Sequence, residues 1–331
     1  MSASSASSAS RINSADKPGF GLWLFPDHDA GTLADVVVEA ESAGLDEVWF
    51  GDEGPARDPV VTLAAAAPRT STVGLGVAVT NPYLRHPAAT ASAFGTLAEL
   101  APGRVVLGLG AGGGLALGPV GVEREQPYTR VTEAVRIARA VLCGTSTDGY
   151  TVPPHAIRAP DVPIFIGARG ERLNRLASEV ADGVFLGGVP LPMTATTLEW
   201  ARWRRPVAAA IYPNVAFNGD EAEAIRPKLV YAFTDGPART SSMLGVNPDA
   251  AARAAMALAE GDDGPARAVI DDRVLDALLV TGTIEEIGRQ LAGLARQHGA
   301  TSVGVAYIGQ DPRGVLEPVA AAAWAFRRAV A

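Results

Sequence analysis

Short apolar segments alternate with helical patterns from the start of the chain to about residue 190. The apolar segments are apolar on both faces, which is typical of strands in a parallel sheet that helices cover on both sides. Strands are predicted over residues 20–25, 47–50, 73–79, 104–109, 162–166 and 184–186. Helices are predicted over residues 33–43, 59–67, 88–100, 129–142 and 171–181. This succession of strand–helix units favours an α/β fold.

The pattern is less regular after residue 190, but it still supplies two more strands. The elements predicted there are a helix over 191–203, a strand over 207–215, mostly helices over about 218–275, a helix over 283–298, a strand over 301–307 and a helix over 316–329. Thr283 and Glu286 form a capping box at the start of one of these helices. Eight strands predict a (β/α)8 TIM barrel with a mainly helical insertion before the last strand, and a doubly wound open sheet is the alternative.

We expect the barrel to occupy residues 17–331 as a single domain, preceded by a disordered tail. Residues 1–16 are rich in Ser and Ala, and they lack the apolar core of a signal peptide. No apolar run reaches the ~20 residues that a membrane-spanning helix needs. A soluble, cytoplasmic protein without a membrane partner is therefore expected.

Composition excludes several classes of function. The chain has 331 residues, of which 48% are hydrophobic, and this is ample for a large core. The net charge of −8 argues against a nucleic-acid partner. A single cysteine excludes an internal disulfide framework, and the four histidines lack metal-ligand spacing, so no metal site is expected.

The segment Thr80-Asn81-Pro82-Tyr83-Leu84-Arg85-His86-Pro87 joins the third predicted strand to its helix. The two prolines force the backbone to turn or extend. Polar groups are thereby held at the carboxyl end of a strand, which is the end of a barrel where ligands bind. This segment is the strongest candidate for a binding site.

The glycines Gly108, Gly110 and Gly113 match the spacing of a dinucleotide fingerprint, but they follow a fourth strand and no helix begins directly after them. A close approach of the backbone to a flat ring or a phosphate is the preferred interpretation. A bend at the barrel rim that requires small residues is almost equally good.

Two other loops carry candidate chemistry. Backbone N–H groups of residues 166–171 could bind an anion at a helix start, with a contact from Arg169, although an ordinary turn is favoured by spacing alone. Asp52 and Glu53 end the second strand, where one could orient a ring or act as a general acid or base. Solvated loop carboxylates are an equally good interpretation of these two residues.

Taken together, five segments in this order resemble the luciferase-like superfamily, specifically its coenzyme F420-dependent branch, which includes methylenetetrahydromethanopterin reductase. The segments are residues 48–53 (VWFGDE), 79–87 (VTNPYLRHP), 96–112 (TLAELAPGRVVLGLGAG), 163–170 (PIFIGARG) and 179–184 (EVADGV). Each motif alone is weak, but the ordered combination is specific. The resemblance covers residues 20–190 and is weaker beyond them.

The resemblance implies a barrel with the deazaflavin ring laid over its C-terminal face. It also implies a non-prolyl cis peptide bond in the third strand, near Ala78-Val79, behind the ring. The remaining residues implied to contact the cofactor are Asp52, Thr80 and Asn81 at the ring or ribityl chain, Gly112 and Gly113 beside the ring, and Gly167, Ala168, Arg169 and Gly170 at the phosphate.

The chain departs from its relatives at two positions of the implied site. Several relatives have His where this chain has Glu53, and some sugar-phosphate dehydrogenases have a proton-donating Glu in the loop where this chain has Gly112 and Gly113. A copied acid–base mechanism is therefore not expected. Glu53, with Asp52, is the substitute catalytic candidate.

The expected function is hydride transfer between coenzyme F420 and a small organic substrate. An FMN-dependent monooxygenase and a non-catalytic flavin-binding barrel are the alternatives. Residues 190–275 would select the substrate, which the sequence does not identify. Because relatives are often dimers, the resemblance also allows a homodimer.

Overall fold

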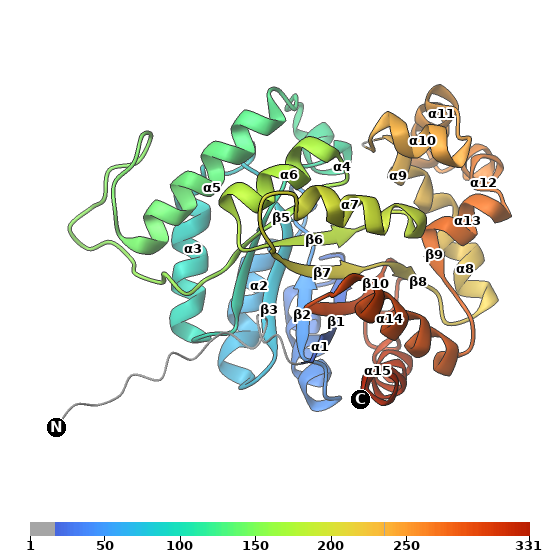
Figure 1. Ribbon diagram of the computed structural model, residues 1–331, viewed down its shortest axis with the longest axis horizontal. Coiled ribbons are helices and arrows are strands. Elements are labelled where there is room, and N and C mark those ends of the chain that lie inside the picture. The colour runs from blue at the N-terminus through green and yellow to red at the C-terminus, as the bar shows by residue number, and fades with distance from the viewer. Residues whose placement is uncertain (1–16, 235) are drawn as a thin grey trace.

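The computed structural model describes residues 17–234 and 236–331 and contains a closed barrel (Figure 1). Eight parallel strands follow one another around it, and strand β1 pairs with both β2 and β10. This closing pair confirms the TIM barrel, and the open-sheet alternative is wrong. The tail predicted for residues 1–16 lies outside the described residues.

The strands agree with the predicted apolar segments to within a few residues. They are β1 Gly19–Leu24, β2 Glu47–Phe50, β3 Gly74–Thr80, β4 Val105–Leu109, β5 Ile164–Gly167, β6 Gly183–Gly187, β7 Ala208–Tyr212 and β10 Ser302–Tyr307. The strand predicted over residues 207–215 is divided into β7 and β8 Asn214–Val215. Pro213 separates them because a proline has no N–H for the strand ladder.

Helices cover the outside of the barrel, as the pattern predicts. They are α1 Ala30–Ser42, α2 Pro59–Ala66, α3 Pro87–Leu100, α5 Pro127–Cys143, α6 Glu171–Val180, α7 Thr194–Ala201, α14 Ile284–His298 and α15 Leu316–Val330. The capping box of Thr283 and Glu286 is present at α14. His86 caps α3 by accepting a hydrogen bond from the N–H of Ala88 at 3.2 Å.

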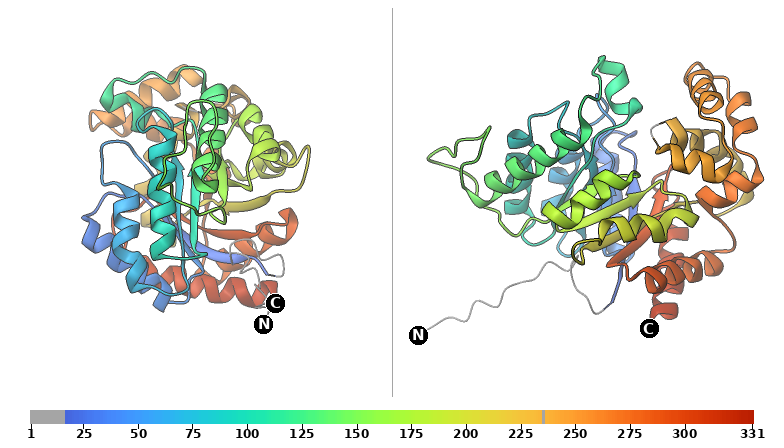
Figure 2. Two further views of the ribbon diagram at one scale, coloured as in Figure 1. Left: turned by 90° about the vertical axis from the view of Figure 1, so that its left-hand side faces the viewer. Right: turned by 45° about the horizontal axis from the view of Figure 1, so that its top comes forward.

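The predicted insertion before the last strand is a helical layer beside the C-terminal end of the barrel (Figures 1 and 2, orange). It consists of α8 Gly219–Ile225, α9 Tyr231–Thr234, α10 Ala238–Leu244, α11 Pro248–Ala259, α12 Gly264–Val269 and α13 Asp272–Leu278, and it returns through β9 Leu279–Val280. Its helices pack around an apolar cluster of their own. No helix in the described part of the chain is long and apolar enough to cross a membrane.

The inside of the barrel is filled by large aromatic side chains and contains one buried acid. Trp49 lies among Phe165, Phe185 and Tyr212, with ring centroids 5.0 to 6.3 Å from its own. Glu47 is only 2% exposed and accepts a hydrogen bond from the Tyr212 hydroxyl. Burial raises the pKa of the Glu47 carboxyl above its ordinary value of 4.5, although polar neighbours oppose the shift.

We predict that Glu47→Gln makes the protein more stable at neutral and alkaline pH. As pH rises through 4.5 the carboxyl ionises in the unfolded chain, while the folded protein, whose Glu47 pKa is higher, still holds the proton, so the free energy of unfolding falls until the folded-state pKa is passed. Gln has no proton to lose, and its amide oxygen can still accept the Tyr212 hydroxyl. The advantage of E47Q should grow with pH, by up to about 1.4 kcal/mol per pH unit.

Urea unfolding at a series of pH values measures this difference. Glu99→Gln, on the exposed face of α3, is the matched control and should follow the pH dependence of the unmodified protein. A difference between E47Q and the unmodified protein that stays constant from pH 4 to pH 8 would contradict the raised pKa of Glu47.

Candidate functional site

The implied site residues all lie at the carboxyl ends of β2 to β5, but they belong to two different surfaces. Ala78 and Val79 join the cluster inside the barrel, and Gly167 lies against Val79. Asp52 and Thr80 instead line a cavity between the strands and the helices outside them. The site therefore has an inner part and an outer part, separated by β3.

A break in the regular geometry of β3 creates this division. The peptide bond between Ala78 and Val79 is cis, as the resemblance implies. The pairing of β3 with β4 shifts its register between Val77 and Thr80. Two consecutive residues consequently face the barrel interior, and the alternation of inward and outward side chains is displaced by one position after them.

The Val79 side chain forms a surface inside the barrel that we call the floor. It fits there because two neighbouring positions are glycine and have no side chains. A Cβ added at Gly110 would lie 2.5 Å from Val79 Cγ2 and 2.8 Å from the carbonyl oxygen of Gly167. A Cβ at Gly167 would collide with Val79 Cγ1. Both positions need glycine because Val79 occupies the space of a side chain, so close packing explains their small size.

Asn81 brings an unpaired donor to the inner part of the site. Its side chain is 2% exposed, and Oδ1 accepts hydrogen bonds from the N–H groups of Tyr83 and Leu84, each at 3.1 Å. Its Nδ2 group has no partner within the described residues. A buried N–H without an acceptor is costly and rare, so this amide indicates a ligand oxygen or water at the barrel mouth.

The loop after β4 packs closely against Asn81. Gly112 has a φ of +68°, a left-handed conformation that favours glycine, and a Cβ there would lie 3.3 Å from Asn81 Cγ. Gly113 is the N-cap of the short helix α4 Gly114–Leu117. Arg124 holds the loop by donating to the carbonyl of Gly112 at 3.0 Å.

The turn between β5 and α6 is organised by its own side chains. Asn174 Nδ2 donates to the carbonyls of Ala168 and Gly170 at 3.0 and 2.9 Å. Gly170 is the N-cap of α6, and no side chain accepts a hydrogen bond from the first N–H groups of this helix there. The space next to Gly170 is open, because no atom lies within 4 Å of a Cβ placed on it. Its surroundings are consistent with a small anion at the helix start.

Arg169 also connects this turn to the insertion, a contact that spacing alone could not predict. Its guanidinium donates from Nη1 to the carbonyls of Tyr231 and Ala232, both at 3.1 Å. These bonds hold helix α9 against the end of β5. Arg169 is thus a link between the barrel and the insertion, and its implied phosphate contact stays a prediction.

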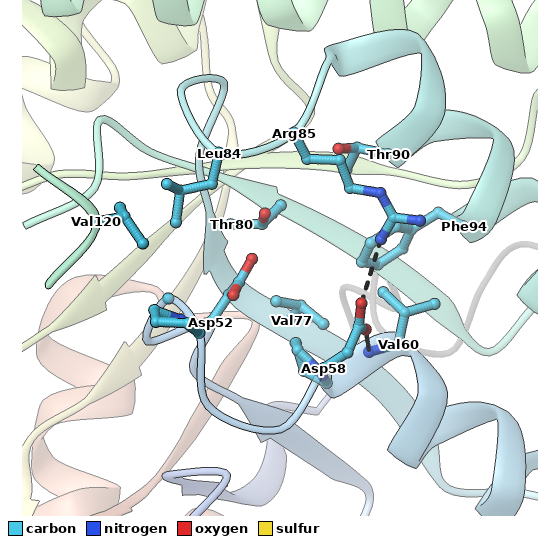
Figure 3. Close-up of a pocket in the computed structure, with 13 residues that line it drawn as sticks. Asp52, Asp58, Val60, Val77, Thr80, Leu84, Arg85, Thr90, Phe94 and Val120 are labelled. Atoms are coloured by element: carbon cyan, nitrogen blue, oxygen red, sulfur yellow. Dashed lines mark hydrogen bonds and ion pairs between the residues drawn. The ribbon is translucent and has the colours of Figure 1, made fainter. Parts of the chain in front are cut away.

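The outer part of the site is a cavity of about 330 Å³ between β2, β3, α2 and α3 (Figure 3). Figure 3 shows the Asp52 carboxyl directed toward Thr80. Burial, together with the charge of Asp58, raises the pKa of Asp52, while a hydrogen bond with Thr80 and the charge of Arg85 oppose the rise. Asp58 and Arg85 form an ion pair at 3.4 Å on the cavity wall.

Thr90 is a lining residue of this cavity that sequence reasoning missed. It is 3% exposed, and its hydroxyl has no partner within the described residues. A threonine in the first turn of a helix gives no sequence signal of this kind. The outer cavity therefore carries the hydroxyls of Thr80 and Thr90 and the Asp52 carboxyl, beside the ion pair of Asp58 and Arg85.

Trp23 is a second residue that sequence reasoning missed. Its indole Nε1 donates to the carbonyl oxygen of Ala78 at 2.7 Å, which is the carbonyl of the cis peptide bond. The indole covers Gly51, where a Cβ would lie 2.8 Å from Trp23 Cζ2 and 3.0 Å from Glu53 Oε1. Glu53 is half-buried and stands beside this indole, at the same end of the barrel.

The family model of luciferase-like monooxygenases matches residues 12–302 of the chain. The fold also resembles the solved structure of the coenzyme F420 dependent tetrahydromethanopterin reductase from Methanopyrus kandleri. The TM-score is 0.78 at 24% sequence identity, over 92% of this chain and 97% of that one.

Two curated relatives are more similar in sequence over shorter segments. The chain is 38% identical over 173 residues to the 5,10-methylenetetrahydromethanopterin reductase of Methanolobus tindarius, which covers 50% of this chain and 53% of the reductase. It is 37% identical over 224 residues to the F420-dependent glucose-6-phosphate dehydrogenase of Kineococcus radiotolerans, covering 59% and 66% respectively. The chain thus spans about half the length of the first of these relatives.

We predict unequal effects of alanine at two glycines of the same turn. Gly167→Ala should lower the free energy of unfolding by about 1–3 kcal/mol, because the new methyl group collides with Val79 in a packed core. Gly170→Ala should lower it by less than about 1 kcal/mol, because the methyl group meets open space and the only loss is that of glycine as the N-cap. Urea unfolding of the unliganded protein measures both, and equal losses would contradict the floor described for Val79.

Proposed function

Because the chain belongs to the luciferase-like monooxygenase family, we propose that it is an oxidoreductase that uses coenzyme F420 to transfer hydride to or from a small organic substrate. The names of the relatives support the cofactor and the class of reaction. The observation that carries the proposal is the buried, unpaired amide of Asn81, two residues after Val79 at the same strand end.

The residues of the inner part fit the chemistry of this cofactor. Val79 presents an apolar surface for a flat ring. Asn81 Nδ2 can donate to a ring carbonyl or a ribityl hydroxyl. The uncapped N–H groups at the start of α6, next to Gly170, can bind the phosphate.

When bound, the deazaflavin supplies or accepts the hydride, so the residues of the chain orient it and handle the proton. We assign proton transfer on the substrate to Glu53, which is half-buried at the barrel mouth beside Trp23. Asp52 keeps its proton to higher pH than an exposed aspartate because its pKa is raised by burial. We assign to Asp52 a hydrogen bond to the cofactor from the outer cavity.

The first prediction of this proposal concerns the cofactor. In parallel fluorescence titrations the protein should bind F420 more tightly than FMN. Gly170→Ala should weaken the binding of F420 about tenfold, because the methyl group enters the space assigned to the phosphate. This change corresponds to ~1.4 kcal/mol of binding free energy. The same variant should bind the phosphate-free deazaflavin riboside as the unmodified protein does.

Each outcome of this titration has a defined meaning. Tighter binding of FMN would move the protein to the flavin-dependent monooxygenases of the family. No binding of either cofactor would overturn the proposed function. If G170A weakened the binding of F420 and of its riboside equally, the phosphate would have to bind at another place.

The second prediction concerns the unpaired amide. Asn81→Asp keeps the oxygen that accepts from Tyr83 and Leu84 but removes the Nδ2 donor. The variant should therefore bind F420 and its riboside roughly tenfold more weakly or worse, because an acceptor oxygen then stands where the ligand oxygen needs an N–H donor. Because the new carboxyl is buried, the variant should melt at a lower temperature, so affinities are compared well below that temperature, where its circular dichroism spectrum should match that of the unmodified protein. Unchanged affinity would show that Asn81 does not contact the cofactor.

A further inference from the structure

Three partly exposed aromatic side chains lie where the barrel mouth meets the insertion. Trp23 and Phe25 come from the carboxyl end of β1, and their rings meet edge to face with centroids 4.7 Å apart. Tyr231 comes from α9, which Arg169 ties to the end of β5. All three pack against the core of the insertion, and we refer to them as the aromatic wall.

The position of the aromatic wall is coupled to the cofactor floor. Trp23 Nε1 donates to the Ala78 carbonyl at 2.7 Å, and Val79 is the next residue along the chain. The indole therefore extends from β1 across the end of β2 at Gly51 and reaches β3. The Ala78-Val79 peptide group therefore connects the two surfaces: it carries the Val79 floor and accepts the hydrogen bond of the Trp23 indole. A substrate that lies above the floor also lies beside the indole.

Three cationic side chains of the insertion are engaged by protein oxygens in the described structure. Lys228 donates from Nζ to the Ile308 carbonyl at 2.9 Å, at the end of β10. Arg273 donates to the Leu244 carbonyl at 2.6 Å, and Arg226 pairs with Glu223 and with Asp272 on α13. Acidic residues also outnumber basic ones over residues 218–278. A dianionic phosphate would find little compensation for its desolvation here.

We propose that the substrate is an uncharged molecule with an apolar cyclic or aromatic skeleton, held against the Trp23 indole, and not a phosphorylated sugar. This inference rests on the proposed function and adds a substrate class to it. Aromatic side chains recognise such skeletons by burying large apolar areas and by edge or stacking contacts. The substrate then differs from the one named for the glucose-6-phosphate dehydrogenase relative.

The test compares two probes on the F420-loaded protein by saturation-transfer NMR and calorimetry. The probes are 1-phenylethanol and glucose 6-phosphate. We expect 1-phenylethanol to bind in the micromolar to millimolar range and glucose 6-phosphate to bind at least tenfold more weakly. The reverse order of affinity would overturn the inference, and so would binding of neither probe.

Variants of Trp23 show whether the wall makes the contact. Trp23→Leu should weaken 1-phenylethanol at least fivefold, while Trp23→Phe, which keeps an aromatic face but loses the N–H donor, should weaken it less than threefold. Trp324→Leu is the matched control, because Trp324 is 58% exposed on α15 and should leave both probes unchanged. Equal affinities for 1-phenylethanol in all three variants would overturn the contact.

The two proposals can fail separately. The probe titrations are repeated on the cofactor-free protein, and F420 affinity is measured for every variant. A protein that binds 1-phenylethanol through Trp23 but does not bind F420 would overturn the proposed function and keep the substrate class. W23F could also lose affinity for F420 while it keeps its affinity for 1-phenylethanol. This result would show that the indole N–H positions Ala78 and Val79 for the cofactor, as its bond to the Ala78 carbonyl leads us to expect.

Discussion

The contact of Val79 with its neighbours is the constraint on which the barrel mouth depends. Its side chain occupies the space beside Gly110 and Gly167, so β4 and β5 can end there only with glycine. Its partner in the cis peptide bond, Ala78, accepts the Trp23 indole N–H and so extends the same constraint to β1. Four strands are positioned around one side chain. A flat ring placed on that side chain would therefore meet a rigid surface and not a flexible loop.

The displaced alternation of β3 explains why the site has two parts. In a regular strand, residues two apart share a face, so Ala78 and Thr80 would both point inward. Because Val79 also faces the interior, Thr80 turns outward and joins Asp52 and Val77 at the outer cavity. The Val79 side chain and the hydrogen-bonding groups of Asp52 and Thr80 then lie on opposite faces of one strand end. A ligand that reaches both must lie across the edge of β3, and this restricts its orientation.

Much of the fold could be predicted from sequence because a parallel barrel repeats one local pattern. Apolar runs located the strands, and a capping box located α14. The cis peptide bond came from the resemblance alone, since no pattern of residue types reveals it. Periodicity could not predict the face that Thr80 occupies, because one displaced residue reverses the alternation. Trp23 and Arg169 were beyond local reasoning for a different reason: their partners are 55 and 62 residues away and are backbone carbonyls, which every residue type presents.

The insertion is bound to the barrel through contacts of this nonlocal kind. Arg169 reaches from β5 to α9, Lys228 reaches from the insertion to the end of β10, and Trp23 packs against both the interior cluster and the insertion core. Each contact uses a polar or aromatic side chain that could otherwise contact a ligand. A substitution that removed the carbonyl partners of Lys228 or Arg169 would loosen the insertion and release a positive charge at the end of the barrel. Under the proposed substrate class, the bonds that hold the insertion in place are therefore also the bonds that keep these two charges occupied.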